Sequence, residues 1–534
     1  MDQTILKIGA FEATYTCKAI AFLVGIIAHR SIFIYGEWHL KAVAVLQAHL
    51  AIWAVILFPA SRYLGAVGAL QEGSLIALAY ATGLFGSISV YRTLFHPLRH
   101  YPGPLLARMT KLWHVVRCLD SKNYVVMEEM HKKYGDFVRT GPNELTIFHP
   151  DTLVTIYEGN RNPFTKPAWY DNLRPYTGLN THRSKLQPTA LASYQPNVTT
   201  HADCLANLIE EQVGKPVVVN QYFYWFSWDV MGQLAFSKSF GMLEEGKWHY
   251  AIKMLRKGLE LVGPFTPVPW LTRVAFAVPV LDTVRNFLKM EDWCARRMDE
   301  RISVSSYLIG WSAKHDRLTK DLHTLYGDSI ALIIAGSDTV AYTLVYIFYY
   351  LAKFPSELEK LRQEQKQEGL TDMHDFRKLQ ALPHLNGVIN EVLRLHPAVP
   401  TGGLRETPAE GFEIGGRWVP GNTLICAPRW TISRLESCFV QGNDFIPERW
   451  YSKPEMILNK KAFAPFALGA YYCIGKNLAY MEMQYVVSSL VSKFDVRFAP
   501  GEDGKGVVDD MVDQFTAAPG QLRVVFEKRK DVVV

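Results

Sequence analysis

The sequence lacks every cysteine pattern that would hold a small fold together. Its seven cysteines are scattered, odd in number and never spaced Cys-x-x-Cys, so they indicate neither a disulfide framework nor a zinc site. No proline-, glycine- or serine-rich linker divides the chain after about residue 101, which favours one large domain over several small ones. Basic residues are dispersed rather than interleaved with aromatics, and the net charge of +6 is mild, so we expect no nucleic-acid binding.

What the sequence does contain is apolar material, with a hydrophobic share of 49% that is enough for a sizeable core. Residues 42–60 and 74–91 carry no charge, and each is close to the roughly 20 residues that cross a bilayer. Residues 15–30 reach spanning length only by including Lys18, which could snorkel. No short basic leader or small-x-small site supports a cleaved signal peptide. The sequence therefore predicts a membrane-anchoring region over 1–100 with two or three spans.

A local excess of basic residues follows the last predicted span. The positive-inside rule assigns such residues to the cytoplasmic side, so we expect residues 101–534 to form a cytosolic catalytic domain attached to membrane lipid. Tyr101-Pro-Gly-Pro104 predicts a stiff, non-helical joint between the two parts. The basic residues are Arg92, Arg99, Arg108, Lys111 and Arg117.

One cysteine stands in a glycine-bounded loop directly before a helical pattern. Cys473 follows Gly469 and precedes Gly475, and apolar residues recur at helical spacing from Asn477 to Leu490. A sulfur at a helix N-terminus meets unpaired N–H groups and the helix dipole, which favour the thiolate. The two glycines would let a flat macrocycle approach the backbone. Cys473 is therefore a candidate iron ligand, and a small buried hydrophobe is the alternative.

The longest helical pattern covers residues 321–354 and is apolar almost all round from 330 to 351, so the helix must be buried. Ala335-Gly336-Ser337-Asp338-Thr339 interrupts it with small and polar residues where a core helix should be apolar. Such an interruption in a buried helix indicates a site. A helix kink with satisfied polar groups is the alternative interpretation.

Two further segments combine Glu and Arg. Glu391 and Arg394 share one face of a helix that stops before Pro397, and Arg449 lies in Pro447-Glu448-Arg449-Trp450. Surface pairs of this kind are common and weak, so the pair by itself indicates little. Residues 412–425, with two glycine-containing turns, predict a hairpin sheet.

The loop Phe466-x-x-Gly469-x-Tyr471-x-Cys473-x-Gly475 resembles the haem-binding loop of the cytochrome P450 family. The family's fold is mainly helical with a smaller β region, and we expect this fold here behind the two or three transmembrane helices. The chain departs from the family at Tyr471, where an arginine usually contacts a haem propionate. Tyrosine carries no charge at pH 7, so other cations must take over.

The resemblance assigns roles to the remaining candidates. Asp338 would relay protons and Thr339 would steady dioxygen, while Glu391, Arg394 and Arg449 would form a buried triad that supports the cysteine loop. The expected haem contacts are Cys473, Phe466, Gly469, Tyr471, Gly475, Ala335 and Gly336, with His182, Arg183, Lys185 and Arg405 as propionate partners and Ala398, Val399 and Leu404 lining the pocket. A solvated cationic face is the alternative for residues 182–185.

The resemblance also implies a function. Haem b would insert one oxygen atom from O2 into a lipophilic small molecule, such as a terpenoid, polyketide or alkaloid of fungal secondary metabolism. The chain has no flavin or nicotinamide motif, so electrons would come from NADPH through a reductase at the endoplasmic reticulum membrane. Two alternatives remain: a haem-thiolate isomerase or dehydratase, and a non-enzymatic multi-span membrane binding protein.

Overall fold

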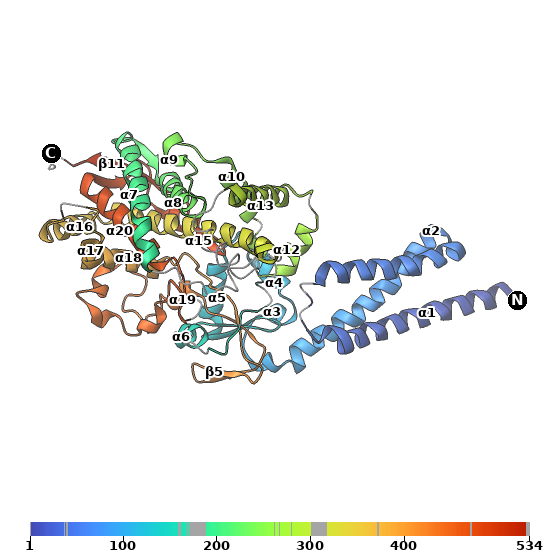
Figure 1. Ribbon diagram of the computed structural model, residues 1–534. Coiled ribbons are helices and arrows are strands. Elements are labelled where there is room, and N and C mark those ends of the chain that lie inside the picture. The colour runs from blue at the N-terminus through green and yellow to red at the C-terminus, as the bar shows by residue number, and fades with distance from the viewer. Residues whose placement is uncertain are drawn as a thin grey trace.

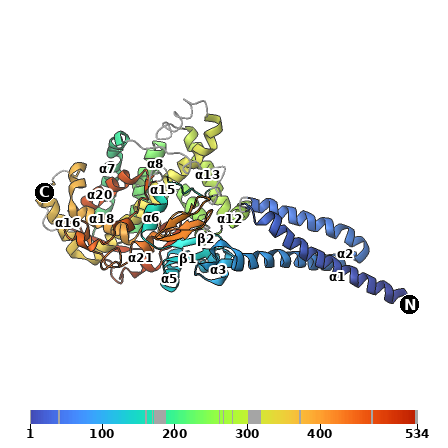
Figure 2. The same ribbon diagram turned by 90° about the horizontal axis from the view of Figure 1, so that it is seen from below.

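The computed structural model describes residues 2–529 except 37, 39–40, 159–161, 168–169, 171–187, 261, 266, 279, 301–317, 371–372 and 470–471. A long helical arm carries the N-terminus and joins a broad, mainly helical body (Figure 1). The arm consists of α1 (Asp2–Ala28), η1 (His29–Phe33), α2 (Ala42–Val90) and η3 (Tyr91–Phe95). It projects from one end of the body, next to α12 (Pro269–Phe276), as Figure 2 shows.

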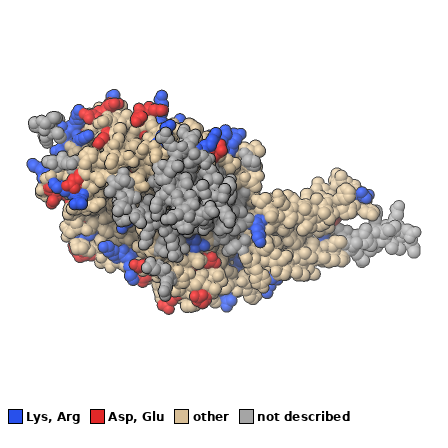
Figure 3. All heavy atoms as spheres, viewed as in Figure 1, with Lys and Arg blue, Asp and Glu red and all other residues tan. Residues whose placement is uncertain are grey.

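The arm is long and apolar enough to cross a membrane. The candidate spans of the arm are Tyr15–Phe33, with 19 residues, and Ala42–Phe95, with 54 residues. A third stretch of sufficient length and hydropathy, Ile330–Lys353, is mostly buried in the body. The second stretch is broken at Gly65, whose φ of 69° and ψ of 168° are not helical, so two apolar halves follow the first segment. Charged side chains are sparse on the arm and frequent on the body in the space-filling view (Figure 3). The described arm thus offers three apolar helical segments that are compatible with membrane anchoring.

The helices of the arm are packed against one another. A Cβ atom at Gly25 would overlap the carbonyl oxygen of Tyr80, and one at Gly83 would overlap that of Phe22, so α1 and α2 touch through their backbones. Lys18 Nζ lies 3.0 Å from Glu72 Oε2. Lys18 thus has an ion-pair partner on the neighbouring helix, and its snorkelling stays a prediction.

The joint between arm and body is irregular, as predicted. Arg139 N–H donates to Pro102 O over 2.7 Å, and a Cβ atom at Gly103 would overlap the backbone of Arg139. The Arg139 guanidinium, fully buried, donates to Arg92 O over 2.9 Å. These contacts fix the last turn of the arm to the sheet of the body.

Four small sheets are present among the described residues of the body. The largest has the order β1 (Phe137–Gly141), β2 (Glu144–Ile147), β7 (Leu424–Cys426) and β4 (Arg405–Glu406), with β2 and β7 parallel and the other pairs antiparallel. The predicted hairpin is present as β5 (Phe412–Ile414) and β6 (Arg417–Val419). The other two sheets are formed by β3 (Pro216–Val218), β11 (Arg523–Lys528) and β8 (Phe494–Phe498), and by β9 (Val512–Gln514) and β10 (Thr516–Ala518).

Helices make up most of the body, which confirms the predicted mainly α fold class. The central helix α15 (Leu318–Lys353) runs through the core, packs on α8 (Val219–Phe236) and ends before Pro355. It also contacts α18 (Pro383–Leu395) and α20 (Lys476–Lys493). The remaining α-helices are α3 (Leu105–Met109), α4 (Leu112–Arg117), α5 (Asn123–Tyr134), α6 (Asp151–Tyr157), α7 (Pro188–Glu210), α9 (Met242–Glu245), α10 (Tyr250–Leu259), α11 (Val262–Phe265), α13 (Asp282–Glu300), α16 (Pro355–Gln367), α17 (Phe376–Ala381), α19 (Arg429–Ile432) and α21 (Lys505–Asp509).

Candidate active site

Cys473 lies three residues before the N-terminus of α20. Its sulfur accepts hydrogen bonds from the backbone N–H groups of Gly475 and Lys476, and its own N–H donates to Phe466 O over 2.8 Å. Burial raises the pKa of the Cys473 thiol, although these N–H groups and the Lys476 charge oppose the rise. The backbone N–H groups at the helix start thus favour the thiolate, as predicted, but desolvation outweighs their effect on the pKa. A coordinated metal cation would deprotonate the thiol outright.

The glycines around the sulfur act differently from the prediction. Gly469 has a φ of +63°, and a Cβ atom there would overlap the carbonyl oxygen of Tyr157 at the end of α6. Glycine is therefore required for close packing against α6, which corrects the expectation that it leaves space for a macrocycle. A Cβ atom at Gly475 would lie 3.9 Å from Cys473 Sγ. Phe466 is half-buried and its ring centroid lies 5.4 Å from that of Tyr480.

The small and polar residues of α15 point to two sides of the helix. Ala335 is exposed and Thr339, one turn later, is half-buried, so one face is open in an otherwise buried helix. Gly336 faces the other way, because a Cβ atom there would overlap Met231 of α8. The expectation that Gly336 leaves room for a ring is therefore wrong: this glycine brings α15 close to α8. Ser337 O accepts a hydrogen bond from Ser227 Oγ over 2.7 Å in the same contact.

Asp338 also lies on the side of α8. Its side chain is only 8% exposed, and Oδ1 has no hydrogen-bond partner of ordinary geometry. Burial raises the pKa of this carboxyl to about 6, while the Arg256 guanidinium and the Trp228 indole N–H oppose the rise. The carboxyl thus titrates near neutral pH, which suits a group that takes up and releases protons.

The raised pKa of Asp338 gives a stability prediction. The unfolded carboxyl loses its proton near pH 3.8 and the folded one near pH 6, so the folded state loses stability as pH rises through this window. We expect Asp338→Asn to be more stable than the wild type at pH 8 by roughly 3 kcal/mol, with a smaller gap at pH 5. Thermal unfolding of both proteins at the two pH values measures the gap, and a gap that does not depend on pH would contradict the assignment.

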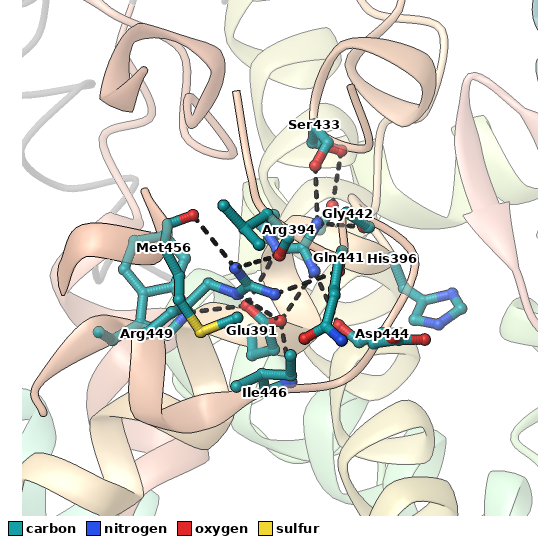
Figure 4. Close-up of polar contacts among 12 residues, drawn as sticks. Glu391, Arg394, His396, Ser433, Gln441, Gly442, Asp444, Ile446, Arg449 and Met456 are labelled. Carbon is teal, nitrogen blue, oxygen red and sulfur yellow. Dashed lines mark hydrogen bonds and ion pairs between the residues drawn. The ribbon is translucent and has the colours of Figure 1, made fainter. Parts of the chain in front are cut away.

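Glu391, Arg394 and Arg449 meet in one buried cluster (Figure 4). Glu391 Oε1 accepts hydrogen bonds from Arg394 Nη2 over 2.7 Å and from Arg449 Nε over 2.9 Å, and Oε2 accepts from Arg394 Nε over 2.9 Å. The remaining guanidinium N–H groups donate mainly to backbone carbonyls, such as those of Ser433 and Gly442. Two cations share one carboxylate, and the carbonyl dipoles stabilise the remaining positive charge by accepting hydrogen bonds. The cluster ties α18 to the segment before the cysteine loop.

Arg405 lies in β4 and is 4% exposed. Its Nη1 donates to Leu404 O over 2.8 Å, and its guanidinium lies 4.6 Å from the ring centroid of Tyr157. A cavity lies beside this strand, and Leu404 and Phe515 line it. The predicted propionate partners His182, Arg183 and Lys185, like Tyr471, lie outside the described residues. Ala398 and Val399 do not line the described cavity.

Sequence reasoning missed Arg429, which is 7% exposed and begins α19 directly after β7. Its Nε donates to Ala464 O over 3.1 Å, at the entrance of the cysteine loop. A basic residue is usually solvent-exposed. One local signal could have indicated its burial. Arg429 stands between Pro428 and Trp430 shortly after a predicted strand, and such a position is rarely open to solvent.

Comparison with known proteins agrees with this geometry. The family model described as Cytochrome P450 matches residues 102–526. The chain is 36% identical to cytochrome P450 monooxygenase lcsK of Purpureocillium lilacinum, over 96% of this chain and 98% of that protein. It is 35% identical to tryprostatin B 6-hydroxylase of Aspergillus fumigatus, over 96% of both chains.

A solved structure carries the same fold. The haem domain of a cytochrome P450DA mutant superposes with a TM-score of 0.62 at 15% identity, covering 77% of this chain and 93% of that one. The fold, the family match and relatives that share more than a third of their residues over nearly the whole length all agree with the loop of Cys473 and the interrupted helix α15. The chain therefore belongs to the cytochrome P450 family and is a monooxygenase of the fungal secondary-metabolism type.

Proposed function

We propose that the protein inserts one oxygen atom from O2 into a terpenoid, polyketide or alkaloid. The observation that carries this proposal is the position of the Cys473 sulfur, which accepts hydrogen bonds from two backbone N–H groups at the start of α20. The name of the hydroxylase from Aspergillus fumigatus supports a hydroxylation of a secondary metabolite.

The residues around Cys473 fit a haem. Cys473 keeps solvent-accessible surface even though nearby protein atoms desolvate its thiol. Ala335 and Thr339 give α15 an open face, and Arg405 places a buried cation beside the cavity strand. Haem supplies the activation of O2 when bound, and thiolate ligation favours O–O cleavage. Cys473 would ligate the iron, with Phe466, Gly469 and Gly475 shaping the loop. The protein's own contribution is to place the substrate, exclude water and deliver protons.

Thr339 and Asp338 have different roles in this proposal: Thr339 would hold dioxygen by a hydrogen bond, and Asp338 would relay protons. Thr339 Oγ1 donates to Ala335 O over 2.7 Å, so its proton is engaged and its lone pairs are left to accept a hydrogen bond on the open face. Asp338 is buried on the side of α8 beside Trp228, and its pKa of about 6 suits a group that would relay protons. Each group thus has a separate environment for its task.

Replacing the Thr339 hydroxyl tests this division. We expect Thr339→Val to bind haem normally, because valine has nearly the same shape, but to lower the share of consumed NADPH that ends in product by about tenfold or more. Product and NADPH are measured together under the same conditions. Ser337→Ala is the matched control, because Ser337 faces α8, and it should leave this share unchanged.

Electrons would come from NADPH through a membrane-bound reductase that docks near the exposed Lys476, beside the cysteine loop. The three apolar helical segments of the arm would hold the chain in the endoplasmic reticulum membrane, with the catalytic domain in the cytosol. The division into an anchoring region over 1–100 and a catalytic domain over 101–534 stays a prediction.

The reduced, carbon-monoxide-bound spectrum of the purified chain tests the proposal. We expect a thiolate-type band in the wild type and its loss in Cys473→Ala. Incubation with reductase, NADPH and isotopically labelled O2 should then place one labelled atom in the product. Product formed without reductase or O2 would indicate the isomerase or dehydratase instead. Absence of any haem band in the wild type would contradict the whole proposal. A non-enzymatic binding protein already disagrees with the family of the chain.

A further inference from the structure

Arg429 is a buried cation without an anionic partner among the described residues. Its side chain is 7% exposed, and its one hydrogen bond there runs from Nε to Ala464 O. Its terminal nitrogens Nη1 and Nη2 donate to no described group, and they are not among the fully buried polar atoms. Charged N–H donors that bind no described protein group and remain accessible can donate two parallel hydrogen bonds to an anion. The position of Arg429 therefore suits an anion.

The position of Arg429 is next to the cysteine loop. Ala464, which accepts its Nε–H, stands two residues before Phe466. On the other side, a Cβ atom at Gly402 would lie 3.3 Å from Arg429 Nη1, and the cavity beside β4 is lined by Gly402 itself. The terminal N–H groups thus lie between the loop that holds Cys473 and the strand segment that lines the cavity.

A second guanidinium converges on the same place. The Tyr157 ring centroid lies 5.5 Å from the Arg429 guanidinium and 4.6 Å from that of Arg405. Both arginines also act on the phenol of Tyr170: burial raises the pKa of Tyr170 to about 12, and each positive charge opposes that rise. Two guanidinium groups near one another repel, so the pair binds a dianion better than a single arginine would.

We propose that Arg429 binds a haem propionate and so supplies the positive charge that Tyr471 does not provide. This inference rests on the proposed haem enzyme. Arg429 can meet the carboxylate with two parallel N–H groups, a geometry that a tyrosine at position 471 cannot offer. The role would pass from the cysteine loop to the first residue of α19, which contacts the entrance of that loop through Ala464.

A double-mutant cycle tests this inference. The full-length proteins are wild type, Arg429→Gln, Tyr471→Arg and the double variant, and the rate at which each releases haem to an excess of haem-free globin is measured. We expect Arg429→Gln to release haem about ten- to a hundredfold faster, which is the value of a hydrogen bond to a charged group. Tyr471→Arg alone should change the rate by less than about threefold, yet it should restore most of the loss in the double variant.

Two measurements separate propionate binding from a structural role. The resonance Raman bands of propionate bending should shift in Arg429→Gln and return in the double variant, and the thiolate-type carbon-monoxide band should persist in all four proteins. Arg417→Gln, which removes a cation that lies over Tyr101 and Phe137, is the matched control and should release haem like the wild type. If Arg429→Gln does not fold, Arg429→Lys takes its place, with a smaller increase expected.

The outcomes are distinct. Additive effects of the two substitutions, or a normal release rate in Arg429→Gln, would overturn the inference and leave the proposed function intact. Faster release with unshifted propionate bands would show that Arg429 only braces the loop, which also overturns it. A wild type without a thiolate-type band would remove the proposed function itself, since that result concerns Cys473 and not Arg429.

Discussion

Replacing Glu391 with glutamine is expected to prevent recovery of folded, haem-containing protein. The carboxylate is fully buried and accepts three hydrogen bonds at distances of 2.7–2.9 Å from Arg394 and Arg449. A glutamine would turn an NH2 group towards guanidinium donors and leave two buried cations without a counter-charge. Breaking one partner of such a network costs about 3–5 kcal/mol. Because a domain has only about 5–15 kcal/mol of stability, most of it would be lost.

The measurement is the yield of soluble, haem-containing protein together with its unfolding midpoint in urea. Glu359→Gln is the matched control, because Glu359 is exposed and lies 3.7 Å from Arg362. Surface pairs of this kind contribute about 0–1 kcal/mol, so the control should behave like the wild type. A Glu391→Gln protein of normal yield and stability would show that the backbone carbonyls alone compensate both arginines.

Replacing Gly469 with alanine is expected to displace the cysteine loop and abolish stable haem binding. The residue has a φ of +63°, which costs an L-residue about 1–2 kcal/mol. In addition, the new Cβ atom would overlap the Tyr157 carbonyl oxygen, which is backbone and cannot rotate away. The loop, α6 or both must move. We expect a total loss of about 3 kcal/mol or more, with Cys473 carried away from its position.

Gly246→Ala separates the two causes. Gly246 has a φ of 61° and a ψ of 30°, and nothing lies within 4 Å of an added Cβ atom. This control carries the backbone cost without the overlap, so it should lose about 1 kcal/mol and keep its haem. Haem content and thermal unfolding of both variants are compared. Equal behaviour of the two variants would show that the contact with Tyr157 does not hold the loop.

Local patterns predicted the elements that carry the candidate site. The central helix was expected over 321–354 and is found at Leu318–Lys353, because its apolar residues recur on all faces and Pro355 ends it. The start of α20 after Gly475 and the hairpin before β7 follow from equally local signals. Each of these signals lies within a few turns of chain, where spacing alone determines which residues share a face.

Contacts between distant segments could not be predicted in this way. Gly336 was expected to face a ring and instead meets Met231, and Gly469 instead meets Tyr157. Lys18 pairs with Glu72, a partner that no local pattern indicated. In each case the sequence identified an unusual residue but not the residue that it contacts. The contacting residue belongs to another element, and no periodicity relates the two.

The sequence by itself determined the apolar N-terminal arm, the mainly helical class and the candidate sulfur at Cys473, because length, hydropathy and local spacing are properties of a single segment. Only the tertiary structure decided which side of α15 is open at Ala335, that Asp338 is buried against α8, and that Arg429 has no described counter-charge. The physical reason is that burial and electrostatic environment depend on what packs against a residue, and the chain brings those neighbours from positions far away in the sequence.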